Sequence, residues 1–141
     1  MTREQARAFG RLHLSGLLLA TLLFGIATRK IHLGVMVWDK SAGDALYAVA
    51  VYFALALALP RLSRQTLALL AMSFCFGIEF LQLTGVPSAV SRHWPWAHWI
   101  LGSTFAWHDV ACYAVGVALA ALVHSLAGSP RTRLTGGRRR A

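Results

Sequence analysis

The sequence predicts an all-α integral membrane protein, a bundle of four transmembrane helices with a tryptophan-rich interfacial segment between the third and the fourth. Hydrophobic residues make up 57 % of the 141 residues and charged residues only 13 %. Soluble domains average about 45–50 % hydrophobic and about 25 % charged residues. The mean hydropathy is +0.55. The apolar residues also gather in four runs near the length that a bilayer requires. These three observations exclude an ordinary soluble domain.

The first expected span covers residues 12–28 and the second covers residues 44–59. Arg29 and Lys30 follow the first run directly, and no small-residue cleavage site follows it, so we expect a retained anchor rather than a signal peptide. The second run is on the short side for a span, and Pro60 closes it because proline disrupts a helix.

Residues 66–83 form the third expected span and residues 107–127 the fourth. The segment between them, residues 84–106, carries three of the five tryptophans. Because tryptophan favours the headgroup level of a bilayer, we expect this segment to lie flat on the outer leaflet. A short re-entrant element over the bundle is the alternative.

The basic residues predict the orientation in the membrane. Lys and Arg are concentrated in the N-terminal tail, the second loop and the C-terminal tail, and the positive-inside rule places these regions in the cytoplasm. We therefore expect residues 1–128 to form one transmembrane domain with a cytoplasmic N-terminus, followed by a basic, disordered cytoplasmic tail at 129–141. Topology signals account for the formal net charge of +9, so the expected partner is the lipid bilayer and not nucleic acid.

A cluster of polar side chains is expected near the outer face. Glu79 lies four residues before the end of its run, about 6 Å deep at 1.5 Å per residue, where an ionisable group costs roughly 2.5–3.5 kcal/mol. It therefore needs partners. Arg29, Asp44, Gln82 and Asp109 fall at the same level on the four helices, and we predict that these five residues form a ligand-binding site or a polar network.

The charges of this predicted cluster do not balance. Three carboxylates face one arginine, so either a second cation joins them or one carboxyl group is protonated. Trp107, His108 and Arg92 are secondary candidates for the same site. A network that only fixes helix register is an equally strong alternative, because carboxylate clusters mark functional sites only statistically.

No motif for catalysis, a cofactor or a metal is evident. His93 and His98 lack a standard zinc spacing, and their loop has no cysteine. A serine nucleophile motif, a phosphate loop, HExxH and a Rossmann fingerprint are all missing from the sequence. We expect no catalytic residue, metal or cofactor. An intramembrane enzyme that uses Glu79 and Asp109 as acid and base on a lipid-linked substrate is the least favoured alternative.

Small residues recur at a spacing of four along the fourth run, at Cys112, Gly116 and Ala120. Such a ridge lets another helix approach closely, so it is a candidate surface for a membrane-protein partner. The corresponding alternative function is that of a structural or accessory subunit of a larger complex. Ridges of this kind also pack helices of one chain together.

Three stretches resemble a family of small bacterial membrane proteins. They are GDALYAVAVY at 43–52, IEFLQ at 78–82 and LGSTFAWHDVACYAVG at 101–116. Their order is similar to that of the domain of unknown function 2809 family: an arginine after the first span, GD before the second, E-F-x-Q ending the third, and G-T-S/T-F-x-W-x-D entering the fourth. Two departures are the inverted hydroxyl order at Ser103 and Thr104 and the histidine at position 108.

The E-x-x-Q spacing also resembles the VanZ-like family, which is linked to glycopeptide antibiotic resistance. The resemblance implies a bacterial inner-membrane protein with a polar pocket at the outer face, without an established reaction. Its ligand would be a lipid headgroup or a glycopeptide-like molecule. Arg29 would hold an anionic group, Glu79 and Asp109 would accept hydrogen bonds, and Gln82 would orient them.

Overall fold

The computed structural model describes residues 3–31, 34, 41–101 and 106–127, without the side chains of residues 3–9, 29, 98 and 99. These described residues form helices and no strand, so the predicted all-α class is confirmed. The long helices are α1 (Arg3–Lys30), α2 (Ala42–Ala58), α3 (Arg64–Gln82) and α6 (Trp107–Ala127), and the short ones are α4 (Val86–His93), the 3-10 helix η2 (Pro95–Ala97) and α5 (His98–Leu101).

Three of the long helices fit a membrane protein by length and composition. Their apolar stretches are Gly10–Thr28 in α1, Arg64–Gln82 in α3 and Trp107–Ala127 in α6. The helix α2 is also apolar but has only 17 residues, so the four-span arrangement stays a prediction. The helix α1 begins at Arg3, before the expected span at residue 12, because its polar first residues can form helix without belonging to an apolar run.

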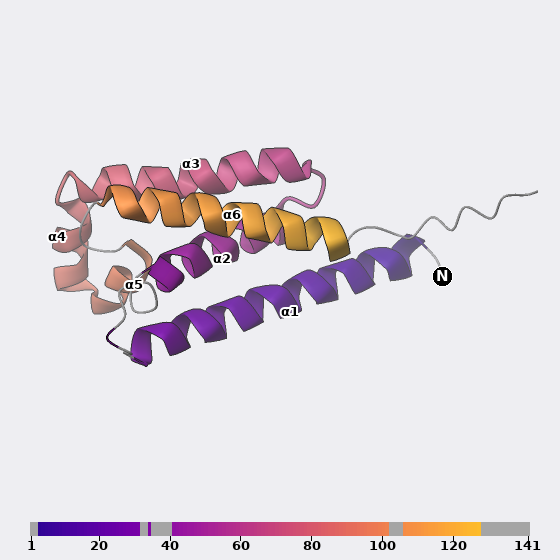
Figure 1. The fold of residues 1–141 in the computed structure, drawn as a ribbon, viewed down its shortest axis with the longest axis horizontal. Coiled ribbons are helices and arrows are strands. Elements are labelled where there is room, and N and C mark those ends of the chain that lie inside the picture. Colours follow the sequence, from indigo (N-terminus) through magenta and orange to yellow (C-terminus); the bar gives the residue numbers. More distant parts are fainter. Residues whose placement is uncertain (1–2, 32–33, 35–40, 102–105, 128–141) are drawn as a thin grey trace, which may run out of the picture.

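The helices α2, α3 and α6 pack against one another, while α1 lies along the edge of this group and packs mainly against α2 (Figure 1). The short helices α4, η2 and α5 lie at the end of the bundle where α3 ends and α6 begins, which we call the capped end (Figure 1). The turn between α2 and α3, residues 59–63, lies at the opposite end, which we call the turn end (Figure 1).

Local signals fix the two ends of α3. At its start, the Ser63 side chain accepts a hydrogen bond from the Thr66 amide at 3.1 Å, which satisfies one of the unpaired N–H groups of the first turn. After its end, Gly85 has a φ of 73°, a left-handed conformation that glycine adopts without steric cost. The chain reverses there, and Pro87 lies in the first turn of α4.

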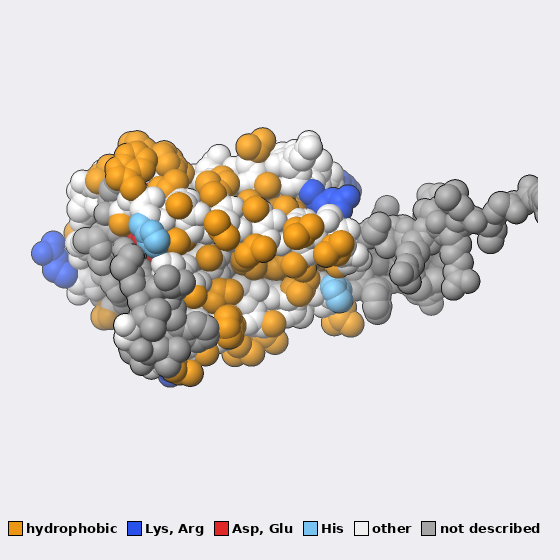
Figure 2. All heavy atoms as spheres, viewed as in Figure 1, with side chains coloured by type: hydrophobic (Ala, Val, Ile, Leu, Met, Phe, Trp, Pro, Cys, Tyr) orange, Lys and Arg blue, Asp and Glu red, His pale blue; other side chains and the backbone are white. Residues whose placement is uncertain are grey.

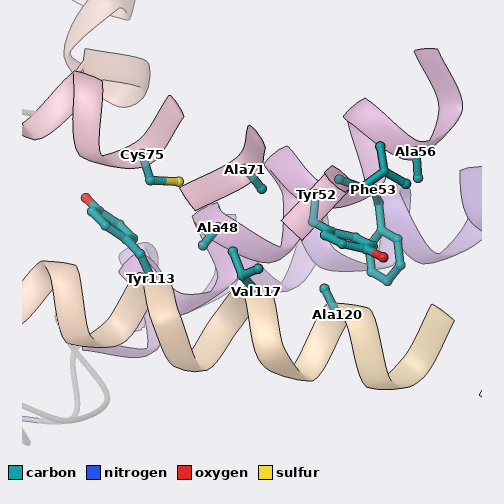
Figure 3. Close-up of a cluster of buried hydrophobic side chains, with 10 residues drawn as sticks. Ala48, Tyr52, Phe53, Ala56, Ala71, Cys75, Tyr113, Val117 and Ala120 are labelled. Atoms are coloured by element: carbon teal, nitrogen blue, oxygen red, sulfur yellow. The ribbon is translucent and has the colours of Figure 1, made fainter. Parts of the chain in front are cut away.

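Small side chains dominate the buried core between α2, α3 and α6. Figure 3 shows the core residues Ala48, Tyr52, Phe53, Ala56, Ala71, Cys75, Tyr113, Val117 and Ala120. The helices approach closely at Gly116, where an added Cβ would meet the backbone carbonyl of Ala45 on α2. The helices therefore pack at a separation that only glycine permits at this position.

The predicted ridge of Cys112, Gly116 and Ala120 is buried inside the chain. Its closest neighbour is α2, through Gly116 and Ala45. The close helix approach expected from these small residues therefore occurs between α6 and α2 of the same chain. A membrane-protein partner remains a prediction, and these three residues do not form an exposed surface for it.

Large apolar side chains cover the outside of the long helices. On the face shown in Figure 2 they extend along the body of the bundle, and Lys and Arg lie near its two ends. Leu19 on α1, Leu69 on α3 and Leu126 on α6 are among the exposed ones. Soluble monomers rarely expose large contiguous apolar patches, whereas a lipid-facing surface is apolar.

The tryptophan-rich segment folds as short helices across the capped end. Trp94 is 58 % exposed and Trp96 is 63 % exposed, while Pro87 and Ala97 are buried. The segment therefore attaches through small residues and presents these two indole rings outward. Its position at a membrane interface stays a prediction.

Candidate functional site

The central feature of the capped end is a fully buried carboxylate. Glu79 lies in the last turns of α3 with 0 % exposure. The Tyr113 hydroxyl donates a hydrogen bond to its Oε1 at 2.7 Å, and the Ala106 amide donates a long one to its Oε2 at 3.4 Å. Because a buried carboxylate is costly without donors, these two contacts explain how the chain holds it.

Tyr113 is a site residue that the sequence analysis missed. It reaches from α6 toward α3 (Figure 3), and it is only 6 % exposed. Two signals could have identified it. A buried tyrosine hydroxyl usually has a hydrogen-bond partner, and Tyr113 lies four residues after Asp109, on the same face of α6.

Two further predicted acids lie at the starts of helices that pack beside Tyr113. Asp44 lies in the first turn of α2 and Asp109 in the first turn of α6, where the helix dipole favours negative charge. Together with Glu79, both act electrostatically on the Tyr113 hydroxyl. Asp109 is 5 % exposed and Asp44 is partly exposed, so the cluster is most accessible on the α2 side. All three predicted acids therefore lie toward the capped end, and a shared site stays a prediction.

Gln82 anchors the short helices over the cluster. Its Nε2 donates a hydrogen bond to the Leu101 carbonyl at the end of α5, at 2.8 Å. Its Oε1 is buried and accepts no hydrogen bond from any residue that the structure describes. Gln82 therefore ties α3 to the segment that precedes α6, and it keeps one acceptor inside the capped end.

The structure leaves the role of Arg29 at the carboxylates a prediction and places Arg92 on the surface. Arg29 lies in the last turn of α1, and its side chain is outside the described part of the chain. Arg92 is exposed on α4. Among the described side chains, no Lys or Arg forms an ion pair with Glu79, whose hydrogen-bond donors are Tyr113 and Ala106.

The remaining secondary candidates lie on the surface of the same end. Trp107 is 73 % exposed. His108 is also exposed, and its Nε2 lies 2.7 Å from the Ser41 Oγ and 3.5 Å from the Cys112 Sγ. These contacts link the start of α6 to the residue before α2. Within the described residues, no three His, Cys, Asp or Glu side chains are placed to hold one metal ion.

An apolar cavity of about 360 Å³ lies next to the carboxylate cluster, between α1 and α2. Its lining includes Thr21, Gly25, Gly43, Tyr47 and Ile100. Gly43 immediately precedes Asp44, and the Tyr47 ring lies 6.2 Å from the Tyr113 ring. Glu79 does not line this cavity. The cavity therefore reaches the first turn of α2, which carries Asp44, although Asp44 itself is not part of the lining.

The sequence model of a family described as "Protein of unknown function (DUF2809)" matches residues 34–117. The chain belongs to this family. The match includes Asp44, Glu79, Asp109 and Tyr113, so the predicted DUF2809 resemblance is confirmed, while the VanZ-like resemblance stays a prediction. No solved structure matches the chain.

This DUF2809 protein has a second buried tyrosine contact, toward the turn end. The Tyr52 hydroxyl on α2 lies 3.0 Å from Nδ1 of His124 on α6, and the two rings meet edge to face at 5.8 Å. Arg64 acts electrostatically on both groups. Like the Tyr113 contact, this pair joins two helices, but its tyrosine bonds to an imidazole.

Proposed function

We propose that this DUF2809 protein spans the bacterial inner membrane with four helices and binds a lipid headgroup at the capped end. The observation that carries the proposal is the fully buried Glu79 with its Tyr113 contact at 2.7 Å. An ionisable group at membrane depth costs roughly 2.5–3.5 kcal/mol. The Tyr113 and Ala106 donors hold the carboxylate in place, but no Lys or Arg side chain that the structure describes balances its charge, which favours a role beyond locking the helices.

The chemistry of the site suits a ligand with an ammonium group and an apolar chain. Asp44, Glu79 and Asp109 concentrate negative charge around one hydroxyl, and a cation would balance it. Phosphatidylethanolamine supplies such a cation, and the apolar cavity beside Asp44 would hold part of an acyl chain. Arg29, as predicted from the sequence, would hold the phosphate.

The proposed orientation places the capped end outward and both termini in the cytoplasm. The exposed Arg11, Arg61 and Arg64 lie at the turn end or beside it, as the positive-inside rule requires for the cytoplasmic side. The 17 residues of α2 extend about 26 Å at 1.5 Å per residue, a little less than a hydrocarbon core of about 30 Å. Local thinning of the bilayer accommodates such a mismatch at modest cost. Residues 1–128 would then form the membrane domain and residues 129–141 its basic tail.

The test compares thermal stability in lipid nanodiscs of two compositions. We expect phosphatidylethanolamine to raise the Tm of the wild-type protein relative to phosphatidylcholine. The substitution Glu79→Gln keeps the size of the side chain and an acceptor for Tyr113 but removes the charge, and we expect it to abolish this difference. Glu4→Gln, the same change in the first turns of α1, is the matched control and should keep it.

Three results would count against or redirect the proposal. A difference in Tm that survives in Glu79→Gln would exclude the carboxylate as the ligand group. A lack of any difference in the wild-type protein would exclude the phosphatidylethanolamine headgroup. Stabilisation by the glycopeptide vancomycin, without an effect of phosphatidylethanolamine, would instead support the glycopeptide-like ligand.

The second candidate is a structural or accessory subunit of a membrane complex. The observation in its favour is that α1 packs mainly against α2 and leaves Leu19, Leu23 and Phe24 at least half exposed. Such a helix offers a long apolar side to another membrane protein. Purification from native membranes in a mild detergent tests this candidate: a stoichiometric partner supports it, and a protein that purifies alone argues against it.

A further inference from the structure

A second cavity lies at the turn end, far from the carboxylate cluster. Its volume is about 460 Å³, within the range of roughly 300–1,000 Å³ that is typical of small-molecule sites. It is lined by Gly10, Arg11, Leu14, Pro60 and Arg61. The cavity therefore lies between the first part of α1 and the turn that joins α2 to α3, and two of the five described residues in its lining are arginines.

The two guanidinium groups are available to a ligand. Arg11 and Arg61 are exposed, and neither forms an ion pair with Asp44, Glu79 or Asp109, the acids whose side chains the structure describes. Those three acids belong to the capped end. The cavity thus has positive charge that described acidic side chains do not neutralise.

Local structure orders one side of this cavity and leaves space on the other. Pro60 has a fixed φ, and the turn is closed by a hydrogen bond from the Leu62 amide to the Leu59 carbonyl at 3.1 Å. On the α1 side, a Cβ added at Gly10 would meet no atom within 4 Å. Arg61 is therefore carried by an ordered turn, and the space beside Arg11 is free for a ligand group.

The surroundings of the cavity are apolar. Leu14 and Pro60 belong to its lining, and a neighbouring hollow on α1 is lined by Leu12, His13, Gly16 and Leu17. Leu12 is 72 % exposed. A ligand held by the two arginines would thus have an apolar surface next to it along α1, as a phospholipid requires and a free phosphate ion does not.

We propose that this cavity binds the phosphodiester group of an anionic membrane lipid. A guanidinium donates two parallel hydrogen bonds to phosphate oxygens, and basic pockets between transmembrane helices on the cytoplasmic side bind anionic headgroups. The acyl chains would lie along α1 over Leu12 and Leu17. This site is separate from the proposed site at the capped end, and its charge is opposite. Its arginines would hold a negatively charged phosphate, whereas the carboxylates of the capped end would hold a positively charged ammonium group.

The experiment measures retained lipid by native mass spectrometry of the full chain, released from nanodiscs that contain equal amounts of phosphatidylglycerol and phosphatidylcholine. We expect the wild-type protein to retain phosphatidylglycerol preferentially. Each arginine near an anionic lipid contributes roughly a fivefold gain in affinity, so the double variant Arg11→Gln, Arg61→Gln should lose about 25-fold. Thermal unfolding of the variant in detergent establishes that it is folded.

The matched control removes the same charge from the basic tail, in Arg138→Gln, Arg139→Gln. Equal loss of phosphatidylglycerol in the control and in the cavity variant would show diffuse attraction and overturn the proposal, as would unchanged retention in the cavity variant. A further arm adds inorganic phosphate to the detergent-solubilised protein. Stabilisation by phosphate without selective retention of phosphatidylglycerol would overturn the assignment to a lipid.

Discussion

The two ends of the buried core use a tyrosine hydroxyl in different ways. Toward the turn end, Tyr52 on α2 meets the imidazole of His124 on α6 at 3.0 Å. At the capped end, Tyr113 on α6 meets the fully buried carboxylate of Glu79 on α3 at 2.7 Å. Both contacts join two helices. The turn end shows that this bundle can join helices with a histidine, without burying an acid.

The carboxylate at the capped end therefore needs a separate explanation. A lock between α3 and α6 requires only a donor and an acceptor, and a glutamine or a histidine would supply the acceptor at a lower desolvation cost. The capped end instead carries Glu79, Asp44 and Asp109, which all act electrostatically on one hydroxyl. Concentrated negative charge in an apolar bundle favours a site that receives a cation. The difference between the capped end and the turn end can be tested directly by substitution.

The largest loss of stability is expected at the contact between α2 and α6, because these two helices contribute residues to both ends of the core. The substitution Gly116→Ala places a Cβ against the backbone of Ala45, which cannot move aside as a side chain does. We expect a loss of about 2–3 kcal/mol in the free energy of unfolding, measured by reversible unfolding in mixed SDS and detergent micelles. Gly77→Ala is the matched control, because a Cβ there meets no atom within 4 Å. Equal effects of the two variants would contradict the close packing of α2 and α6.

The next largest effect is expected for Tyr113→Phe. This change removes the 2.7 Å hydrogen bond and leaves Glu79 buried with only the long contact from Ala106. Loss of one partner of a buried charged group costs about 1–3 kcal/mol. The same unfolding measurement gives the value. A change of less than about 0.5 kcal/mol would mean that Tyr113 does not hold the carboxylate.

A smaller effect is expected for Tyr52→Phe at the other end. Its partner His124 is partly exposed, so water can replace part of the lost contact. We expect a loss of about 0.6 kcal/mol, the average for an interhelical hydrogen bond in a membrane. The comparison with Tyr113→Phe is the informative quantity: if Tyr52→Phe is the more damaging variant, the proposed difference between the two ends is wrong.

The long helices were largely predictable from the sequence, because apolar runs bounded by charges and proline define them. The fourth expected span, residues 107–127, coincides with α6, and the third, 66–83, lies close to α3. The cap at Ser63 adds two residues to the start of α3. The short helices α4 and α5 were not foreseen, because an eight-residue and a four-residue helix are too short for a periodic pattern.

The candidate site was predictable only in part. The burial of Glu79 and Asp109 follows from the apolar runs around them, since a charge in such a run faces the interior. The Tyr113 contact depends on how α6 is rotated relative to α3, which a single sequence does not specify. The same holds for Tyr52 and His124, which are 72 residues apart, and for the ridge at Gly116, which packs on α2 of the same chain.

The most direct test of the central claim is the stability of Glu79→Gln, measured together with its response to phosphatidylethanolamine. If Glu79 is retained to bind a ligand, the variant keeps the contact with Tyr113, gives up only the long contact from the Ala106 amide, and loses a buried charge. It should therefore be at least as stable as the wild-type protein in detergent, and it should gain nothing from phosphatidylethanolamine. A variant that loses about 1 kcal/mol or more of stability and still responds to phosphatidylethanolamine would contradict the account, because Glu79 would then serve only to lock α3 to α6.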